Sequence, residues 1–230
     1  MTFVACLSGI FKNYLIFTII IFIHEIGHFM TGVILGWNSD KICIYPYGGC
    51  TKFSESLNKP LIEELLILIM GPITQMLFYF LVRNLFNYDD YILFRNYNYA
   101  LLIFNLMPIY TLDGGRILNI LFSYKIPYKK AILASIFISI FVILFLLSNV
   151  NSFVFLIIIL FLVCKLIDEY KNIGFYYNRF LLERRLNPTK YKKLKVVGNI
   201  NDFYKNRKHI LRIYNKSYTE KEALNKYFKL

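Results

Sequence analysis

The stretch IFIHEIGHFM, from Ile21 to Met30, places two histidines and a glutamate inside an apolar run. Residues four apart share a face of an α-helix, so His24 and His28 can bind one Zn²⁺ ion while Glu25 reaches a water molecule on that ion. The alternative is a pair of buried histidines hydrogen-bonded to neighbouring carbonyl groups. It must explain three costly polar side chains in about one turn of a membrane helix. The stretch therefore predicts a metal site.

The composition is that of an integral membrane protein. Hydrophobic residues make up 57% of the 230 residues and charged residues 18%, whereas soluble domains are usually less apolar and more charged. We predict an all-α polytopic membrane protein with about five to six transmembrane segments. The clearest apolar runs are residues 14–36, 60–85, 91–107, 130–148 and 152–167. Residues 1–11 extend only about 16 Å as a helix, so they belong to a partial span or lie at the interface.

The segment between the first two spans is less apolar and rich in turn residues. Residues 41–53 read KICIYPYGGCTKF, and Gly48-Gly49 permits a tight turn. This pattern predicts a short membrane-associated β-hairpin or a re-entrant loop. An extended peptide can add as a strand to the edge of such a hairpin, which makes Gly48 and Gly49 candidate substrate-binding residues.

The net charge of +13 is concentrated near the carboxyl terminus. From Lys165 onward there are 17 Lys or Arg and 6 Asp or Glu, a surplus of 11. A basic segment beside a membrane span is typical of the cytoplasmic side, next to an anionic leaflet. A nucleic-acid-binding tail is the weaker interpretation, because no recognised motif accompanies the charge. We predict a transmembrane domain at 1–167, a basic cytoplasmic region at 168–230 and no nucleic-acid partner.

A catalytic zinc ion usually has three protein ligands, so a third is needed. Glu55, Glu63 and Glu64 lie in a loop or a first helical turn near lysines, and His209 lies in the basic tail, where we expect a surface residue. Asp113, in FNLMPIYTLDGGRIL, is the better candidate because it is an acid in apolar surroundings followed by two glycines. Its alternative role, a helix N-cap, is compatible with metal binding.

Asn105, eight residues before Asp113, is another polar residue in the same apolar segment. Its amide can donate a hydrogen bond to a substrate carbonyl or a developing oxyanion. It can equally tie two helices together. The spacing alone leaves both roles open.

In their order along the chain, these motifs resemble the site-2 protease family of intramembrane zinc metalloproteases. The family pairs HExxH in one transmembrane helix with N-x-x-P…L-D-G two helices later, and this chain reads HEIGH and NLMPIYTLDGG. YPYGG is similar to the family's hairpin and MGPITQ to its Gly-Pro helix motif. Thr111 stands where members often have proline, which removes no catalytic group.

The resemblance implies roles for particular residues. It implies that His24, His28 and Asp113 are the zinc ligands and that Glu25 is the general base. Asn105 and Pro108 are the implied substrate contacts. It also implies a multi-pass protein of the bacterial cell membrane. The charged loops place its active site toward the cytoplasm.

Segments outside the motifs are similar to a sporulation subgroup of the family, which processes pro-sigma-K in endospore formers. They read NKPLIEEL, DEYKNIGFYYNRFLLERRLN and EALNKYF. This implies a pro-sigma factor as protein substrate and regulatory membrane proteins as partners, and it allows a homo-oligomer. Some members carry a nucleotide-sensing domain, but the roughly 40 residues after Lys190 are short for one, so ATP sensing is not assigned.

We predict a zinc-dependent metalloendopeptidase that acts by regulated proteolysis within or beside the membrane. Two other classes would use some of the same residues. A membrane zinc transporter would need a polar pathway across the bilayer, whereas the sequence shows one compact constellation. An inert scaffold that binds a partner through its basic tail has no chemical need for Glu25.

Overall fold

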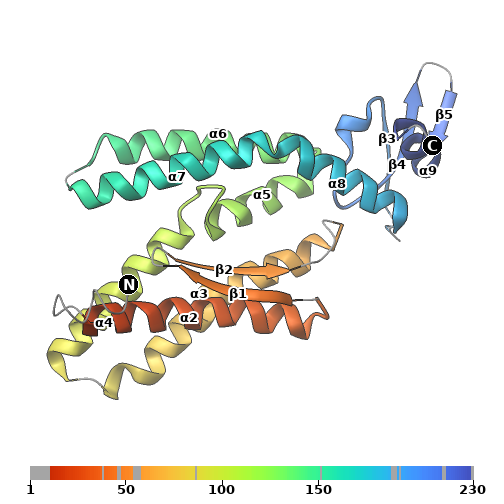
Figure 1. The fold of residues 1–230 in the computed structure, drawn as a ribbon. Helices are drawn as coiled ribbons and strands as arrows, with labels where there is room; N and C mark the ends of the chain where they lie inside the picture. Colours follow the sequence, from red (N-terminus) through yellow and green to blue (C-terminus); the bar gives the residue numbers. More distant parts are fainter. Residues whose placement is uncertain are drawn as a thin grey trace. The chain divides into compact units, whose positions relative to one another are not determined.

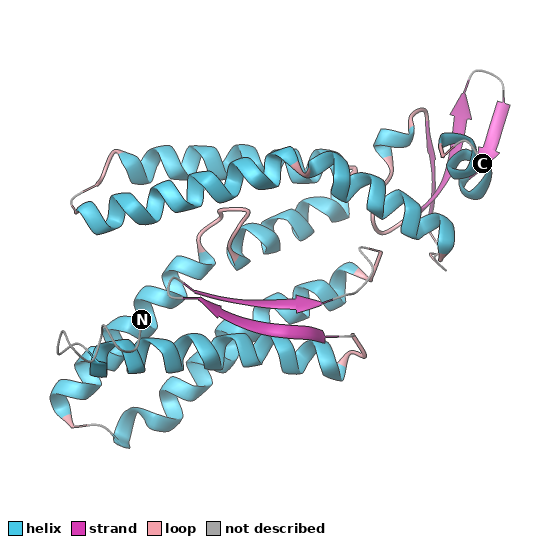
Figure 2. Cartoon of the chain, viewed as in Figure 1, coloured by secondary structure: helices cyan, strands magenta, loops and turns pink. Residues whose placement is uncertain are grey.

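The computed structural model describes residues 11–37, 39–45, 48–53, 58–85, 87–150, 152–187, 191, 193–213 and 216–228. Helices make up most of it (Figure 2), and the predicted all-α polytopic membrane fold with a short hairpin is confirmed. The chain forms two compact units: the first unit comprises Met1–Glu55 and Leu65–Met107, and the second comprises Ser56–Glu64 and Pro108–Leu230. The predicted boundary at 167/168 stays a prediction. Of the partial span expected at 1–11, residues 1–10 lie outside the described residues.

Three of the described helices are long and apolar enough to cross a membrane: α2 (Phe11–Ile34), α3 (Leu61–Val82) and α6 (Tyr128–Leu147). The shortest has 20 residues, which corresponds to about 30 Å of helix and matches the hydrocarbon core of a bilayer. Two other predicted spans are also helical, α4 (Tyr88–Leu106) and α7 (Phe153–Lys171), but each carries at least three charged residues.

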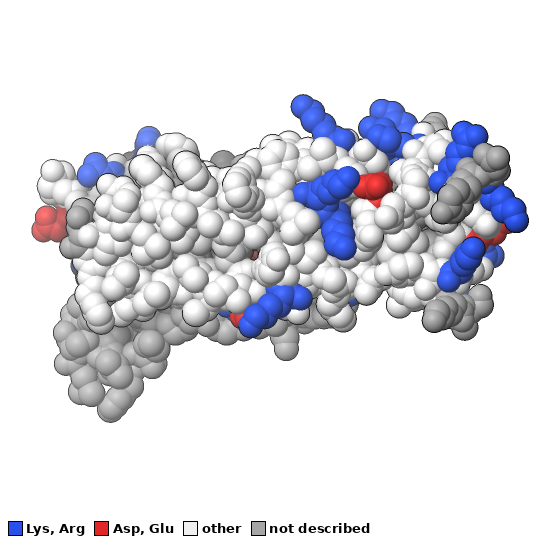
Figure 3. Space-filling view, turned by 90° about the horizontal axis from the view of Figure 1, so that it is seen from above, with Lys and Arg blue, Asp and Glu red and all other residues white. Residues whose placement is uncertain are grey.

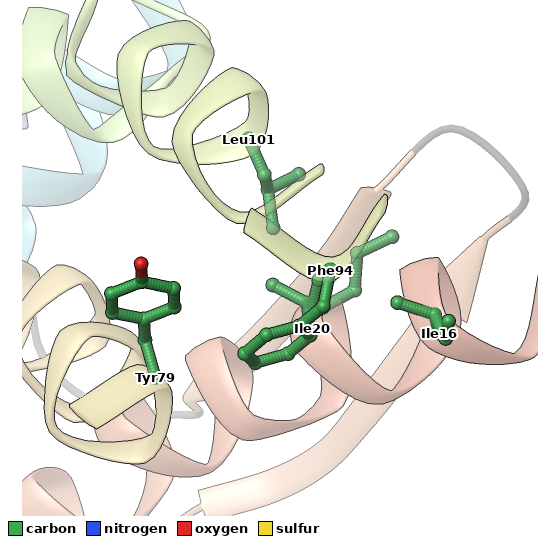
Figure 4. Packing of buried hydrophobic residues seen from close by; sticks show 6 residues of the cluster. Ile16, Ile20, Tyr79, Phe94 and Leu101 are labelled. Atoms are coloured by element: carbon green, nitrogen blue, oxygen red, sulfur yellow. The ribbon is translucent and has the colours of Figure 1, made fainter. Parts of the chain in front are cut away.

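An apolar cluster joins α2, α3 and α4 in the first unit (Figure 4). Ile16 and Ile20 come from α2, and Phe94 and Leu101 from α4; all are buried. Tyr79 of α3 stacks on Phe94, with ring centroids 5.7 Å apart. These contacts fix the three helices that carry the candidate site.

The strands β1 (Ser39–Tyr45) and β2 (Gly48–Phe53) form an antiparallel hairpin. Tyr45 pairs with Gly48, so Gly48 and Gly49 are the first two residues of the second strand. Both strands contact α2 in the first unit (Figure 1). The hairpin is therefore confirmed, and a role for the two glycines in substrate binding stays a prediction.

In the second unit, α5 (Asp113–Lys125) packs on α6, and α6 lies beside α7 (Figure 1). Ser139 of α6 is buried, and its hydroxyl accepts a hydrogen bond from the backbone N–H of Tyr110 at 2.8 Å. A Cβ atom at Gly115 would lie 2.1 Å from the carbonyl of Ile109. The loop before α5 is thus held against α6 and folded tightly onto the first turn of α5.

The basic carboxyl-terminal region is folded as part of the second unit. On the face shown in Figure 3, lysines and arginines gather over this region, while much of the remaining surface is uncharged. A three-stranded sheet has the order β3-β4-β5, with β3 parallel and β5 antiparallel to β4. The elements are α8 (Ile173–Leu186), β3 (Leu194–Val197), η2 (Ile200–Asp202), β4 (Lys208–Ile213), β5 (Lys216–Thr219) and α9 (Glu220–Tyr227).

Arg184 of α8 is the hub of this region, with only 2% of its surface exposed. Its guanidinium donates to the carbonyls of Lys205 and Arg207, at 3.1 and 2.8 Å, and forms an ion pair with Glu220 of α9 at 3.3 Å. It also donates to the side chain of Asn58 at 3.1 Å. One buried arginine therefore joins α8, the loop before β4, α9 and the segment before α3.

The expectation that His209 lies at the surface is wrong, since it is 1% exposed. Its Nε2 accepts the backbone N–H of Tyr204 at 2.8 Å, and its ring stacks on Phe203 at 4.3 Å. Its Nδ1 lies 3.0 Å from Arg184 and 3.6 Å from the carboxylate of Glu220. His209 is buried because the tail is folded and supplies partners for both of its ring nitrogens.

Candidate active site

The predicted histidine pair lies on one face of α2 and is buried, with His24 2% exposed and His28 6% exposed. The two Nε2 atoms are 3.1 Å apart, and the rings meet edge to face. Glu25 is also buried, and one ligand atom from each of the three residues lies within 4.8 Å of the others. The HExxH spacing therefore produces the cluster that the sequence predicts.

The hydrogen bonds of the two rings determine which nitrogen of each carries the proton. His28 Nδ1 lies 2.8 Å from the carbonyl oxygen of Ile67, which can only accept, so this Nδ1 is protonated. His24 Nδ1 lies 2.9 Å from Oε1 of Gln75, which can also only accept. Both rings are therefore Nδ1–H tautomers, and their Nε2 lone pairs point to the same place.

These two lone pairs provide a test of whether the site suits a metal ion. Lone pairs only 3.1 Å apart repel each other unless a cation is shared between them. In a tetrahedral zinc site, Zn–N bonds of about 2.0–2.1 Å place two nitrogens about 3.3 Å apart. The tautomers and the spacing of His24 and His28 thus fit zinc.

The two helices at the site approach each other through glycines. A Cβ atom at Gly71 of α3 would lie 2.3 Å from the imidazole of His28. One at Gly27 of α2 would lie 2.0 Å from Oγ1 of Thr74 and 2.5 Å from the carbonyl of Met70. The Gly-Pro segment of α3 therefore packs closely against α2, which lets α3 supply acceptors to both histidines.

The structure also brings Asn105 to the histidine pair. Its Nδ2 lies 3.4 Å from His24 Nε2, on the nitrogen that faces the candidate metal position. This contact joins α4 to α2 at the candidate site, so both roles of Asn105 stay open. Its contact with substrate stays a prediction.

The other predicted site residues lie in the second unit or in the hairpin. Asp113 is the first residue of α5, and Leu112 occupies the N-cap position, so Asp113 lies one residue inside the helix. Pro108 is exposed in the loop after α4. The roles of Asp113 and Pro108 stay predictions. Among the rival ligands, Glu64 forms an ion pair with Lys205, with Oε2 2.7 Å from Nζ.

Sequence reasoning missed Gln75 and Asn98. Both are fully buried polar residues: Gln75 contacts His24, and Asn98 contacts Gln75. A polar side chain in the apolar run after MGPIT was the available signal. What it contacts depends on how α3 packs against α2 and α4, which local spacing does not reveal.

Paired imidazoles and a glutamate on a membrane helix define a candidate metallopeptidase centre. The model of peptidase family M50 matches residues 13–88 and 90–146, more than half of the chain. The chain belongs to this family, and its resemblance to site-2 proteases is confirmed.

Two relatives support this assignment. The chain is 31% identical over 191 residues to stage IV sporulation protein FB of Bacillus subtilis (strain 168), covering 77% of this chain. The match spans 65% of that relative's length. The fold is similar to that of the site-2 protease from Methanocaldococcus jannaschii, with a TM-score of 0.55 and 26% identity over 69% of this chain and 77% of the other.

Proposed function

We propose that this chain is an intramembrane zinc metalloprotease that cleaves a membrane-associated protein. The observation that carries the proposal is the pair of Nε2 lone pairs 3.1 Å apart in a membrane helix, next to a buried glutamate. His24 and His28 supply two zinc ligands, and Asp113 supplies the third.

When bound, zinc lowers the pKa of its water toward neutrality and polarises the scissile carbonyl group. Glu25 accepts a proton from the attacking water and delivers it to the leaving amine. Its burial keeps bulk water away from this exchange. The amide of Asn105, directed at His24 Nε2, donates a hydrogen bond to the substrate carbonyl, and Pro108 shapes the adjoining substrate contact.

The substrate must be extended before cleavage, because the peptide groups of a helix are hydrogen-bonded and shielded. The β1–β2 hairpin contacts α2, the helix that carries the histidines. A substrate strand adds to the edge of this hairpin near Gly48 and Gly49 and so reaches the site extended.

The substrate is a pro-sigma factor such as pro-sigma-K, presented from the cytoplasmic side of a bacterial cell membrane. The similarity to a stage IV sporulation protein supports a role in sporulation, and the basic region at 168–230 supports the orientation. Regulatory membrane proteins and a second copy of this chain are the proposed partners, and a transmembrane domain at 1–167 carries the catalysis.

Co-expression of the chain with a candidate pro-sigma factor tests this function. We expect wild type to shorten the substrate, and Glu25→Gln to leave it intact while keeping zinc and fold, because an amide cannot accept the water proton. Cleavage by Glu25→Gln at the wild-type rate would contradict the proposal. Zinc flux into proteoliposomes without proteolysis would instead indicate a transporter. The absence of both activities would indicate an inert scaffold.

A further inference from the structure

We propose that Gln75 is a positioning residue that fixes the tautomer and the orientation of His24 for metal binding, and that Asn98 in turn fixes Gln75. This inference rests on the proposed function, because it concerns the same zinc site. It assigns a role to two residues on α3 and α4 that neither bind the metal nor touch the substrate.

The three side chains form a continuous buried path from α4 to α2. Gln75 and Asn98 are each 0% exposed. Gln75 Nε2 donates to the backbone carbonyl of Asn98 at 2.8 Å and to Asn98 Oδ1 at 3.1 Å. Gln75 Oε1 lies 2.9 Å from His24 Nδ1. Both hydrogens of the Gln75 amide are therefore used, and its oxygen is left for the histidine.

The backbone carbonyl of Asn98 determines which way the side-chain amide of Gln75 is oriented. The backbone carbonyl of Asn98 cannot donate, so the group that faces it must be the amide nitrogen of Gln75. The amide oxygen then points at His24, which must place its proton on Nδ1. His24 Nε2 is left unprotonated, which is the form that binds a metal ion.

A simple role in joining helices does not explain this arrangement. Tyr79, one turn after Gln75, already joins α3 to α4 through a 2.9 Å hydrogen bond with the hydroxyl of Tyr91. Gln75 adds a contact to a third helix, at His24 Nδ1, whose protonation decides whether the metal-facing Nε2 carries a proton. Partners of this kind typically contribute a 10–100-fold effect on metal affinity.

The test is zinc affinity of the purified full-length protein in detergent, measured by competition with a chelator after the metal has been stripped. We expect Gln75→Leu to weaken zinc binding by roughly 10–100-fold, because His24 Nδ1 loses its acceptor. Tyr79→Phe is the matched control: it removes a partly buried α3–α4 hydrogen bond without touching His24, and should leave zinc affinity unchanged.

The visible spectrum of the Co²⁺-loaded protein provides a second readout, since it reports ligand geometry. It should change in Gln75→Leu and stay the same in Tyr79→Phe. Wild-type affinity and spectrum in Gln75→Leu would contradict the inference. Failure of the wild-type protein to bind zinc would instead contradict the proposed function, so the two failures are distinguishable.

Discussion

The Nε2 atoms of His24 and His28 lie 3.1 Å apart, while both Nδ1 atoms face oxygens of α3. Helix α2 thus supplies the two candidate ligands, and α3 determines their tautomers. Because the acceptors are a backbone carbonyl and a buried amide, neither adds a charge to the site. The metal-facing side of the pair is prepared by packing between helices, which makes several consequences measurable.

Replacement of Gly71 by alanine should disrupt the site. The new Cβ atom would lie 2.3 Å from the imidazole of His28, and overpacking of this kind costs about 1–3 kcal/mol. We expect Gly71→Ala to lower both the unfolding temperature and the zinc content. Gly174→Ala is the control, because nothing lies within 4 Å of the added atom and alanine favours a helix. Equal zinc content in both variants would show that α3 does not constrain His28.

Replacement of Asp113 tests the third ligand. Asp113→Ala should weaken zinc binding by more than the roughly 10–100-fold expected for an outer partner of a ligand. Asp89→Ala is matched, because Asp89 also lies in the first turn of a helix and loses the same favourable interaction with the helix dipole. Chelator competition measures both variants. If the two bind zinc with the same affinity, Asp113 is not a ligand.

Removal of Arg184 should unfold the carboxyl-terminal region. Arg184→Met leaves the carboxylate of Glu220 partly buried without its arginine, and breaking a buried pair typically costs about 3–5 kcal/mol. Arg179→Met on the same helix breaks a more exposed ion pair, with Glu183, and should cost at most about 1 kcal/mol. Hydrogen exchange of β3–β5 should rise in Arg184→Met alone. Equal protection of β3–β5 from exchange in both variants would show that Arg184 does not hold this region together.

Mild acid should loosen the same region. Burial lowers the pKa of His209, the hydrogen bond with Glu220 opposes this shift, and the charges of Arg184 and Arg207 add to it. The folded state therefore prefers neutral His209, so this stabilisation is complete above the ordinary value of 6.5 and is lost as the pH falls below it. Burial by itself would raise the pKa of Glu220, but the interactions with His209 and Arg184 outweigh burial and lower this pKa. Protonation of Glu220 therefore reduces the stability of the fold only when the pH falls below 4.5.

Hydrogen exchange at pH 7.5 and 5.5 measures this effect, since Glu220 stays ionised at both. We expect faster exchange of β4 at pH 5.5, after correction for the intrinsic pH dependence, because protonated His209 cannot accept the N–H of Tyr204. Unchanged protection of β4 at pH 5.5 would contradict the role given to His209.

Local patterns predicted the parts of the molecule that local geometry determines. His24 and His28 meet because residues four apart share a helix face, and the hairpin forms within the predicted segment 41–53, although Gly48 and Gly49 lie in its second strand. The apolar runs likewise predicted the helices, since the length of a span is set by the bilayer.

Contacts between distant segments were not predictable in this way. Gln75 reaches His24 only because Gly27 and Gly71 let two helices approach closely. In the tail, β3 pairs in parallel with β4 across an intervening loop, and the burial of His209 follows from that pairing. Short strands in a lysine-rich segment lack the apolar alternation that predicts a sheet.

The most direct test of the central claim is the zinc content per chain of purified wild type and of the double variant His24→Ala/His28→Ala. We expect close to one zinc per wild-type chain and background metal in the double variant, with the protein still folded in detergent. One zinc per chain in the double variant, or none in active wild type, would contradict it.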